Sequence, residues 1–218
     1  MTRVLIADDD HLMRAGLVEL LLSDADIEIV GQASTGREAV EQARRLAPDV
    51  VLMDVRMPDL DGIGATRELS RAAPAAKVLI LTTFEEDDYI FGALRAGASG
   101  FLLKRSRPEE LIAAVHTIAA GDALLSPSIT RRVLDRLAQQ PVPDFTDRAR
   151  LDALTPRELE VFEHLARGLS NREIAAALAV EESTIRTHVK RVLMKLGLRD
   201  RIQTIIFAYE SGALRQRE

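Results

Sequence analysis

Five short apolar runs, separated by stretches of helical periodicity, occupy the first 120 residues and restrict the possible folds more than any other feature. Each run consists mainly of aliphatic and β-branched residues, and the runs lie at Arg3–Ala7, Ile27–Gln32, Val50–Met53, Val78–Leu81 and Gly100–Leu103. The stretches between them repeat leucine, valine or alanine at helical spacing. Strands that alternate with helices predict an α/β fold with a doubly wound parallel sheet, covered by helices on both faces.

The remaining residues show no strand pattern. Residues 121–150 are predicted to form a linker that contains two prolines and a helix near residues 127–139. Residues 151–218 have helical periodicity throughout and are predicted to form a small all-α domain of four helices. We therefore expect two domains, residues 1–120 and 151–218, joined by this linker.

Capping signals mark the beginnings of helices in the second domain. Two pairs of residues form capping-box signatures: Thr155 with Glu158, and Ser170 with Glu173. A third helix is predicted over residues 182–196, and a fourth over about residues 201–209.

The composition excludes several classes of protein. The 218 residues include no cysteine, so disulfides and thiolate zinc sites are excluded. No apolar run approaches the ~18 residues of a membrane span, and the N-terminus has no apolar segment of signal-peptide length. We therefore expect a cytoplasmic protein that does not bind membranes.

The charge differs between the two predicted domains. Residues 1–122 hold 13 Lys and Arg against 21 Asp and Glu, a net charge of −8. Residues 150–218 hold 12 against 10, a net charge of +2. An acidic region followed by a more basic one indicates that the two domains have different partners.

Carboxylates follow two of the predicted strands. Asp8 and Asp9 come directly after the first run, and Asp54 comes directly after the third. In a doubly wound sheet these strands are neighbours where the strand order reverses, and ligands bind beyond their carboxyl ends. Like charges at close range are costly unless a cation neutralises them. Oxygen ligands without histidine or thiolate favour Mg²⁺ over Zn²⁺, so the sequence predicts a magnesium site.

Two further polar residues end strands at the same rim. Thr82 follows the fourth run and Lys104 follows the fifth. A hydroxyl, an ammonium and a metal ion around one carboxylate would accommodate an additional dianion. The chemistry that this set permits is nucleophilic attack by Asp54 on a phosphoryl group, with the metal and lysine holding the transferring oxygens. A single acid at a strand end is more often solvated or capping, so this interpretation depends on the complete set.

The predicted helix over residues 182–196 is apolar along one face and basic along the opposite one. The apolar face consists of Ile185, Val189, Val192, Leu193 and Leu196. The opposite side and its flank carry Ser183, Arg186, Thr187, His188, Lys190, Arg191, Met194 and Lys195. A short capped helix precedes this one, with a tight turn predicted at Glu181 and Glu182, as in a helix-turn-helix. In the major groove, arginine and lysine donate to guanine, and a threonine methyl group contacts thymine.

Four segments of the first domain resemble the receiver domain of two-component response regulators: "LIADDDHLMRAGL", "VVLMDVRMPDLDG", "LILTT" and "GASGFLLK". The resemblance covers residues 1–120 and implies strand order 2-1-3-4-5. It implies that a sensor histidine kinase phosphorylates Asp54, which becomes 4-aspartylphosphate. It further implies that Asp9 and Asp54 bind Mg²⁺ directly, that Asp8 binds it through water, and that the main-chain carbonyl of Arg56 is another ligand.

The same resemblance implies roles for residues on the last two strands. Lys104 would contact the phosphoryl group, Thr82 would turn toward it, and Phe101 would follow as the aromatic residue of the switch. The sequence departs from many relatives at Arg105, where they have proline, and at Asp10, where the closest branch has histidine. The additional acid at Asp10 could change the affinity of the site for the metal, but it matters little for the identity of the domain.

The segment "LTPRELEVFEHLARGLSNREIAAALAVEESTIRTHVKRVLMKLGLRDR", residues 154–201, resembles the LuxR-type DNA-binding domain. A receiver followed by this domain is typical of the NarL/FixJ class of response regulators. By this resemblance, Arg186, Thr187 and Lys190 are base-contact positions, and Thr184 and Lys195 are phosphate-contact positions. Arg191 also suits a phosphate, because such contacts position the protein on DNA without specifying sequence.

The two resemblances together imply a DNA-binding transcription regulator that is controlled by phosphorylation. It would not be an enzyme beyond promoting its own phosphorylation and dephosphorylation. The implied partners are a sensor histidine kinase, double-stranded promoter DNA, a second copy of the phosphorylated chain, and RNA polymerase.

Other functions are compatible with parts of the sequence. Aspartate-dependent phosphatases also use an aspartyl nucleophile after a strand, although they typically place a second acid two residues later, where this chain has Arg56. The helical domain could alternatively bind a protein instead of DNA. A LuxR protein that senses a small molecule is disfavoured, because the N-terminal half has the pattern of a receiver.

Overall fold

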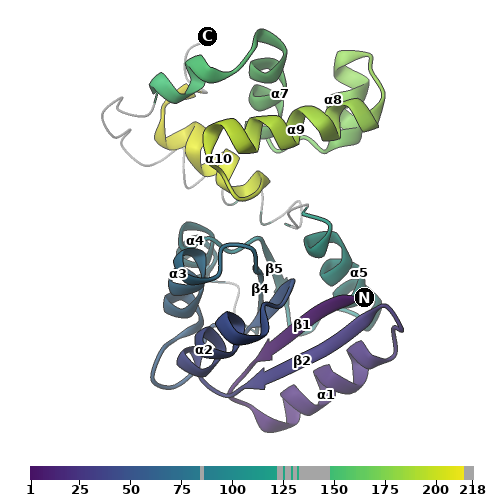
Figure 1. Ribbon diagram of the computed structural model, residues 1–218, viewed down its shortest axis with the longest axis vertical. Helices are drawn as coiled ribbons and strands as arrows, with labels where there is room; N and C mark the ends of the chain where they lie inside the picture. The colour runs from purple at the N-terminus through teal and green to yellow at the C-terminus, as the bar shows by residue number, and fades with distance from the viewer. Residues whose placement is uncertain (84–85, 122–124, 126–128, 130–131, 133–147, 214–218) are drawn as a thin grey trace. The chain divides into compact units, whose positions relative to one another are not determined.

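Two units make up the chain, residues 1–129 and residues 130–218 (Figure 1). The computed structural model describes residues 1–83, 86–121, 125, 129, 132 and 148–213. Most of the helix predicted near residues 127–139 lies outside the described residues, so that helix and the predicted domain boundaries stay predictions. Each unit is considered by itself.

A five-stranded parallel sheet forms the centre of the first unit, in the order β2-β1-β3-β4-β5. Its strands are β1 (Thr2–Ala7), β2 (Ile27–Ala33), β3 (Val50–Met53), β4 (Lys77–Thr82) and β5 (Gly100–Leu103). The apolar runs form these strands because the sheet is covered on both faces: all four residues of β3 are buried. The predicted fold class and strand order are confirmed.

Helices cover both faces of this sheet. On one face, α1 (His11–Leu22) and α5 (Pro108–Ala119) pack their leucine, valine and isoleucine side chains against the strands. On the other face, α2 (Gly36–Leu46), α3 (Gly62–Ala72) and α4 (Asp87–Ala96) lie side by side (Figure 1). The carboxyl ends of the strands meet at one edge of this layered unit, where the residues that follow the runs include the buried Asp8 and Asp54.

The second unit is all-α within its described residues. A 3₁₀ helix, η1 (Arg148–Ala153), precedes α7 (Pro156–Ala166), α8 (Asn171–Leu178), α9 (Glu182–Leu196) and α10 (Arg201–Glu210). Both predicted capping boxes are present, at the N-termini of α7 and α8. The aromatic rings of Phe162 and Phe207 meet edge to face in the core, with centroids 6.1 Å apart.

The turn between α8 and α9 differs from the prediction. The turn was predicted at Glu181 and Glu182, whereas it comprises Ala179–Glu181. The helix that follows it, α9, begins at Glu182 and ends at Leu196, as predicted. Ala179 ends α8 in the left-handed conformation, with φ of 52°. Helices that end in this conformation usually have glycine or asparagine there, and alanine rarely takes it. No local signal in the sequence therefore marks the end of α8.

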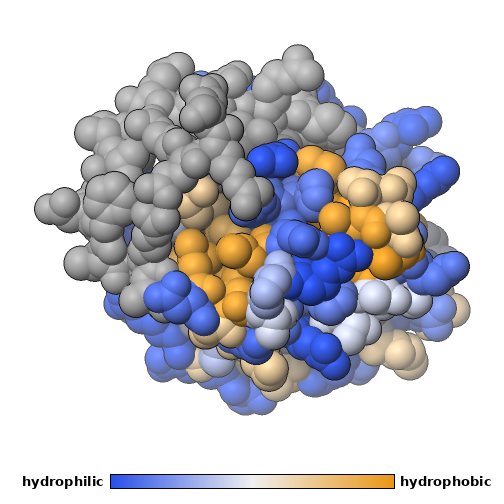
Figure 2. Space-filling view, turned by 90° about the horizontal axis from the view of Figure 1, so that it is seen from above, coloured by the Kyte–Doolittle hydropathy of each residue, from blue (hydrophilic) through white to orange (hydrophobic). Residues whose placement is uncertain are grey.

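Among the described side chains in view in Figure 2, apolar patches lie between hydrophilic side chains. Among the described residues, no helix has both the length and the apolar character that a membrane crossing requires.

Gly62, the first residue of α3, lies against the backbone of Asp54. A Cβ atom there would overlap the Asp54 carbonyl oxygen, which cannot move without displacing the end of β3. We expect Gly62→Ala to destabilise the protein by about 2 kcal/mol, the usual cost of overpacking. Gly16→Ala is the matched control, because a Cβ at Gly16 meets nothing within 4 Å. The control should stabilise α1 by about 0.5–1 kcal/mol. Urea unfolding measures both, and equal stabilities of the two variants would contradict the prediction.

Candidate functional site

The carboxyl ends of β1 and β3 bring Asp8, Asp9 and Asp54 together. The sheet fixes their backbones, since the Asp54 N–H donates to the Ala7 carbonyl at 2.8 Å and the Asp8 N–H donates to Ala33 at 3.1 Å. One carboxylate oxygen from each of the three acids lies within 4.8 Å of the others. Asp8 and Asp54 are buried and Asp9 is exposed. The three acids converge because parallel neighbours end at the same edge of the sheet.

The Lys104 ammonium lies between two of these carboxylates. Its Nζ is 2.7 Å from Oδ2 of Asp8 and 3.1 Å from Oδ2 of Asp54. All three side chains are almost removed from solvent, with 9% of Lys104, 2% of Asp8 and 9% of Asp54 exposed. Buried carboxylates are costly unless a cation pairs with them. Lys104 therefore compensates the negative charge that this crevice accumulates.

Burial and charge shift the proton affinities at this centre. Burial raises the pKa of the Asp54 carboxyl, although Lys104 opposes this change. Burial disfavours the Lys104 ammonium, but its contacts with Asp8 and Asp54 outweigh that effect and raise the pKa of Lys104. Lysine consequently remains positively charged at neutral pH. The site holds a fixed positive charge beside a partly desolvated carboxylate oxygen.

Thr82 and Phe101 lie on the two strands beyond β3. Thr82 is the last residue of β4 and is fully buried, and Phe101 in β5 is 1% exposed. The Lys104 N–H donates to the Thr82 carbonyl at 2.8 Å, which joins the ends of the two strands. Thr82 and Lys104 thus share the rim that holds Asp54, whereas Phe101 lies in the interior.

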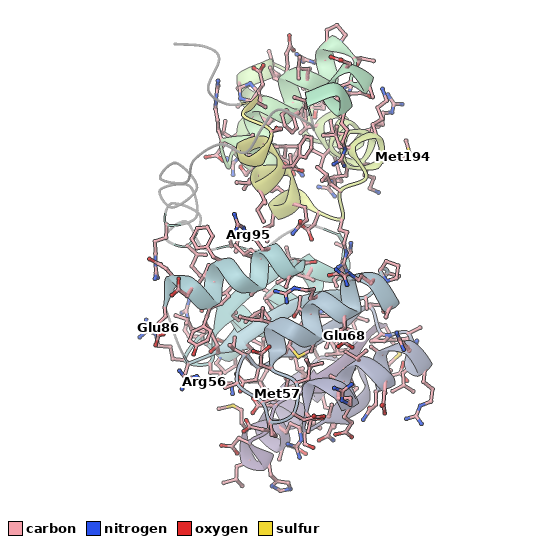
Figure 3. All side chains as sticks on the ribbon, turned by 90° about the vertical axis from the view of Figure 1, so that its left-hand side faces the viewer. Arg56, Met57, Glu68, Glu86, Arg95 and Met194 are labelled. Atoms are coloured by element: carbon pink, nitrogen blue, oxygen red, sulfur yellow. The ribbon has the colours of Figure 1, made fainter. Side chains whose placement is uncertain are left out.

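Arg56 makes a contact that the sequence did not indicate. Its Nη2 donates to the Tyr89 hydroxyl at 2.8 Å, and its guanidinium carbon lies 5.3 Å from the centroid of the Tyr89 ring. Tyr89 belongs to α4, which begins after Glu86, and Figure 3 labels Arg56 and Glu86 on the same side of the unit. The contact joins the loop after Asp54 to the first turn of α4.

Asp10 has a local role beside the acidic cluster. It is the N-cap of α1, and its Oδ1 accepts from the N–H groups of Met13 at 3.1 Å and Leu12 at 2.8 Å. These two bonds lower the pKa of Asp10. An acid also suits the positive end of the helix dipole. The departure from the family pattern at this position is therefore explained by helix capping.

The donor set of the crevice is suited to a hard divalent cation. Asp8, Asp9 and Asp54 offer only carboxylate oxygens, the ligands that Mg²⁺ prefers. The acidic cluster is thus typical of a magnesium site.

The second candidate site is the outer face of α9. A hollow on this face is lined by Glu182, Ser183, Arg186, Thr187 and Lys190. On the opposite side, Ile185, Val192 and Leu196 are buried in the core, while Val189 and Leu193 are only partly buried. Met194 projects from the helix with 73% of its surface exposed (Figure 3). Burial of one face presents the polar residues of the other to solvent, as the periodicity predicts.

Lys195 is held differently from the other basic residues of α9. Its Nζ lies 2.6 Å from Oε2 of Glu158, whose side chain is 5% exposed. The same carboxylate oxygen accepts from the Thr155 N–H at 2.9 Å in the capping box of α7. The bond from Lys195, followed by that from Thr155, lowers the pKa of Glu158 to about 2. Lys195 thus fastens α9 to α7, a role that the prediction of a phosphate contact missed.

Family comparisons match both units. Residues 4–116 match the response regulator receiver domain, and residues 152–208 match the bacterial regulatory proteins of the luxR family.

Several relatives match the chain along nearly its whole length. The chain is 39% identical over 210 residues to the uncharacterized transcriptional regulatory protein YxjL of Bacillus subtilis (strain 168), covering 96% of each chain. It is 36% identical over 213 residues to the response regulator protein VraR of Staphylococcus aureus (strain Mu3 / ATCC 700698), covering 97% of this chain and 98% of VraR. The crystal structure of ChrA, the response regulator of a heme-sensing two-component system, is 35% identical with a TM-score of 0.52, and the match covers 96% of this chain and 97% of ChrA.

Removal of the Lys104 ammonium should leave two buried carboxylates without a cation. We expect Lys104→Met to destabilise the metal-free protein at neutral pH by on the order of 3 kcal/mol, the cost of breaking a buried ion pair. Mg²⁺ should stabilise this variant more than the wild type, because the ion supplies the missing positive charge. Lys190→Met, which removes an exposed lysine, is the control. Urea unfolding with and without Mg²⁺ measures the effect, and equal loss of stability in the two variants would refute it.

Proposed function

The chain belongs to the two-component response regulators of the NarL/FixJ class, which carry a LuxR-type DNA-binding domain, and we propose that phosphorylation of Asp54 controls its action on promoters. As a member of this class it is a transcription regulator and not a catalytic enzyme. That membership decides against a stand-alone phosphatase and against a helical domain that binds only proteins.

One observation carries the proposal: the Lys104 ammonium lies 3.1 Å from the carboxylate of Asp54, at the end of a buried strand. A rigid strand holds the nucleophile, and a neighbouring cation is ready to contact an anionic phosphoryl group. In the proposed transfer, a carboxylate oxygen of Asp54 attacks the phosphorus of a phosphohistidine on the sensor kinase. The P–O bond forms, the P–N bond breaks, and the released imidazole takes up a proton.

Mg²⁺ is the proposed cofactor. Asp9 and Asp54 would bind it directly, Asp8 through water, and Arg56 through its main-chain carbonyl. When bound, the ion would neutralise charge on the transferring phosphoryl oxygens. Tyr89 would help to position the Arg56 carbonyl, because it bonds the side chain of the same residue.

Thr82, Lys104 and Phe101 are the residues proposed to respond to phosphorylation. Lys104 would contact a phosphoryl oxygen, and this contact would compete with its present ion pair to Asp8. Thr82 would turn toward the phosphate, and the Phe101 ring would follow. A switch of this kind requires that the phosphoryl group favours one of two arrangements of these residues.

The outer face of α9 is the proposed DNA-reading surface. Arg186, Thr187 and Lys190 line its hollow and are the proposed base contacts. Thr184 and Arg191 are exposed and are the proposed phosphate contacts. Lys195 would contribute less directly, since Glu158 already engages its ammonium.

The remaining partners follow from the proposed switch. The phosphorylated chain would form a homodimer, and the dimer would place two α9 helices on double-stranded DNA about one helical turn apart. A sensor histidine kinase would supply the phosphoryl group, and RNA polymerase would respond to the bound regulator. The proposed location is the cytoplasm, where promoter DNA and the kinase's phosphorylated domain are both accessible.

Asp54→Asn tests the phosphoryl-accepting role. We expect the variant to take up no phosphate from acetyl phosphate and Mg²⁺, because an amide lacks the nucleophilic carboxylate oxygen. Asp59→Asn, which alters an exposed acid of the same loop, should be phosphorylated like the wild type. Intact-mass spectrometry measures the uptake. Equal phosphorylation of Asp54→Asn and the wild type would sink the proposal.

Lys190→Ala tests the DNA-reading face. We expect it to weaken binding to a selected operator by about 1–3 kcal/mol, the usual value of a good base contact. Met194→Ala shortens an exposed side chain of the same helix without removing charge, so it should bind nearly as the wild type does. Fluorescence anisotropy at fixed salt measures both affinities, and unchanged operator affinity of Lys190→Ala would contradict the assignment.

A further inference from the structure

A carboxylate lies among the basic residues of the DNA-reading face. Glu182 is the first residue of α9 and lines the same hollow as Arg186, Thr187 and Lys190. It is the one acid among the five residues that line this hollow. Its Oε1 lies 3.3 Å from Nη2 of Arg186, one helical turn further on.

Two ordinary explanations of this acid are incomplete. The ion pair with Arg186 is exposed, with 47% of the Glu182 side chain accessible, and such pairs contribute little to stability. An acid also suits the N-terminus of a helix, and Glu182 is the acidic residue of the first turn of α9. The same preference is met by Glu181 at the N-cap, which makes no side-chain capping hydrogen bond and does not line the hollow. Neither explanation requires the carboxylate to lie inside the hollow among the basic residues.

Contact with DNA would destabilise the Glu182 carboxylate. The phosphates repel a carboxylate, and covering the hollow removes the water that solvates it. This cost is offset only where the DNA presents a donor to the carboxylate. In the major groove the exocyclic amino group of cytosine is such a donor, and glutamate accepts from it.

The side chains beside Glu182 differ in whether they can still donate to a base. The Thr187 hydroxyl donates to the Ser183 carbonyl at 3.1 Å, so its proton is already engaged within the helix. Arg186 has further N–H groups beyond the one that faces Glu182, and these can donate to a guanine. Glu182 and Arg186 therefore offer an acceptor and donors side by side, which matches a cytosine beside a guanine.

We infer that Glu182 is a specificity-determining residue, which selects operators with a cytosine amino group next to the base contacted by Arg186. It lowers affinity for all DNA through repulsion and lowers it least for the matching sequence. Discrimination by a penalty against wrong partners is a general route to specificity. The inference rests on the proposed DNA-reading role of the outer face of α9.

Selection from a randomised double-stranded DNA library tests the inference with the full-length chain after treatment with acetyl phosphate and Mg²⁺. For the wild type, one position of the selected motif should require cytosine. Glu182→Gln should change the preference there toward adenine, because glutamine both accepts from and donates to adenine. Glu182→Ala should remove the preference at that position alone.

Affinities provide a second readout. Glu182→Ala should bind a random duplex about fivefold more tightly than the wild type and should discriminate the selected operator about tenfold less. Glu181→Ala is the matched control: it removes the neighbouring acid at the same helix terminus, but Glu181 does not line the hollow. It should leave the selected motif and the discrimination within about twofold of the wild type.

The outcomes separate the inference from the proposal on which it rests. An unchanged motif in both Glu182 variants, or an equal loss of discrimination in Glu181→Ala, overturns the role of Glu182. If Arg186→Ala and Lys190→Ala also leave operator binding unchanged, the DNA-reading face itself has been assigned wrongly. Circular dichroism verifies that each variant keeps its helices.

Discussion

The contact of Lys104 with Asp8 and Asp54 is the interaction on which the receiver unit depends. A parallel sheet with helices on both faces buries the ends of its central strands, and this chain places two carboxylates there. Such an arrangement is tolerable only when positive charge is supplied from within the fold or from solution. The lysine at the end of β5 supplies one charge, and a divalent cation would supply more. The same electrostatic requirement would make the site responsive to the proposed phosphorylation, because an incoming phosphoryl group would change the balance of charge.

This responsiveness extends to the loops around the site. Arg56 lies two positions after Asp54 and is bound through its side chain to Tyr89 of α4. Gly62 allows α3 to begin against the backbone of Asp54, where a larger residue would not fit. The segment that begins at Asp54 therefore contacts α3 through the Asp54 backbone and α4 through Arg56. Contact of this kind is needed if the proposed phosphorylation of Asp54 is to affect the surface of the unit.

The DNA-binding unit holds a highly charged helix, α9, in a fixed orientation. Burial of Ile185, Val192 and Leu196 anchors one face of α9, and the Lys195–Glu158 pair fastens it to the capping box of α7. A helix anchored in this way can present its basic residues to DNA with little loss of backbone freedom on binding. The outer face also carries Glu182, so affinity and discrimination are adjusted on the same surface.

The sequence by itself determined the elements with strong local signals: five strands, the capping boxes of α7 and α8, and the two faces of α9. These depend on residues a few positions apart, which periodicity and capping chemistry describe well. It also placed the acids at strand ends, because each of them directly follows an apolar run and parallel strands end at the same edge of the sheet. Only the tertiary structure decided which side chains meet: Arg56 with Tyr89, 33 positions apart, and Glu158 with Lys195, 37 positions apart. The left-handed turn at Ala179 was equally hidden. Pairings between distant residues and strained turns are set by how whole elements pack, and no local pattern encodes that packing.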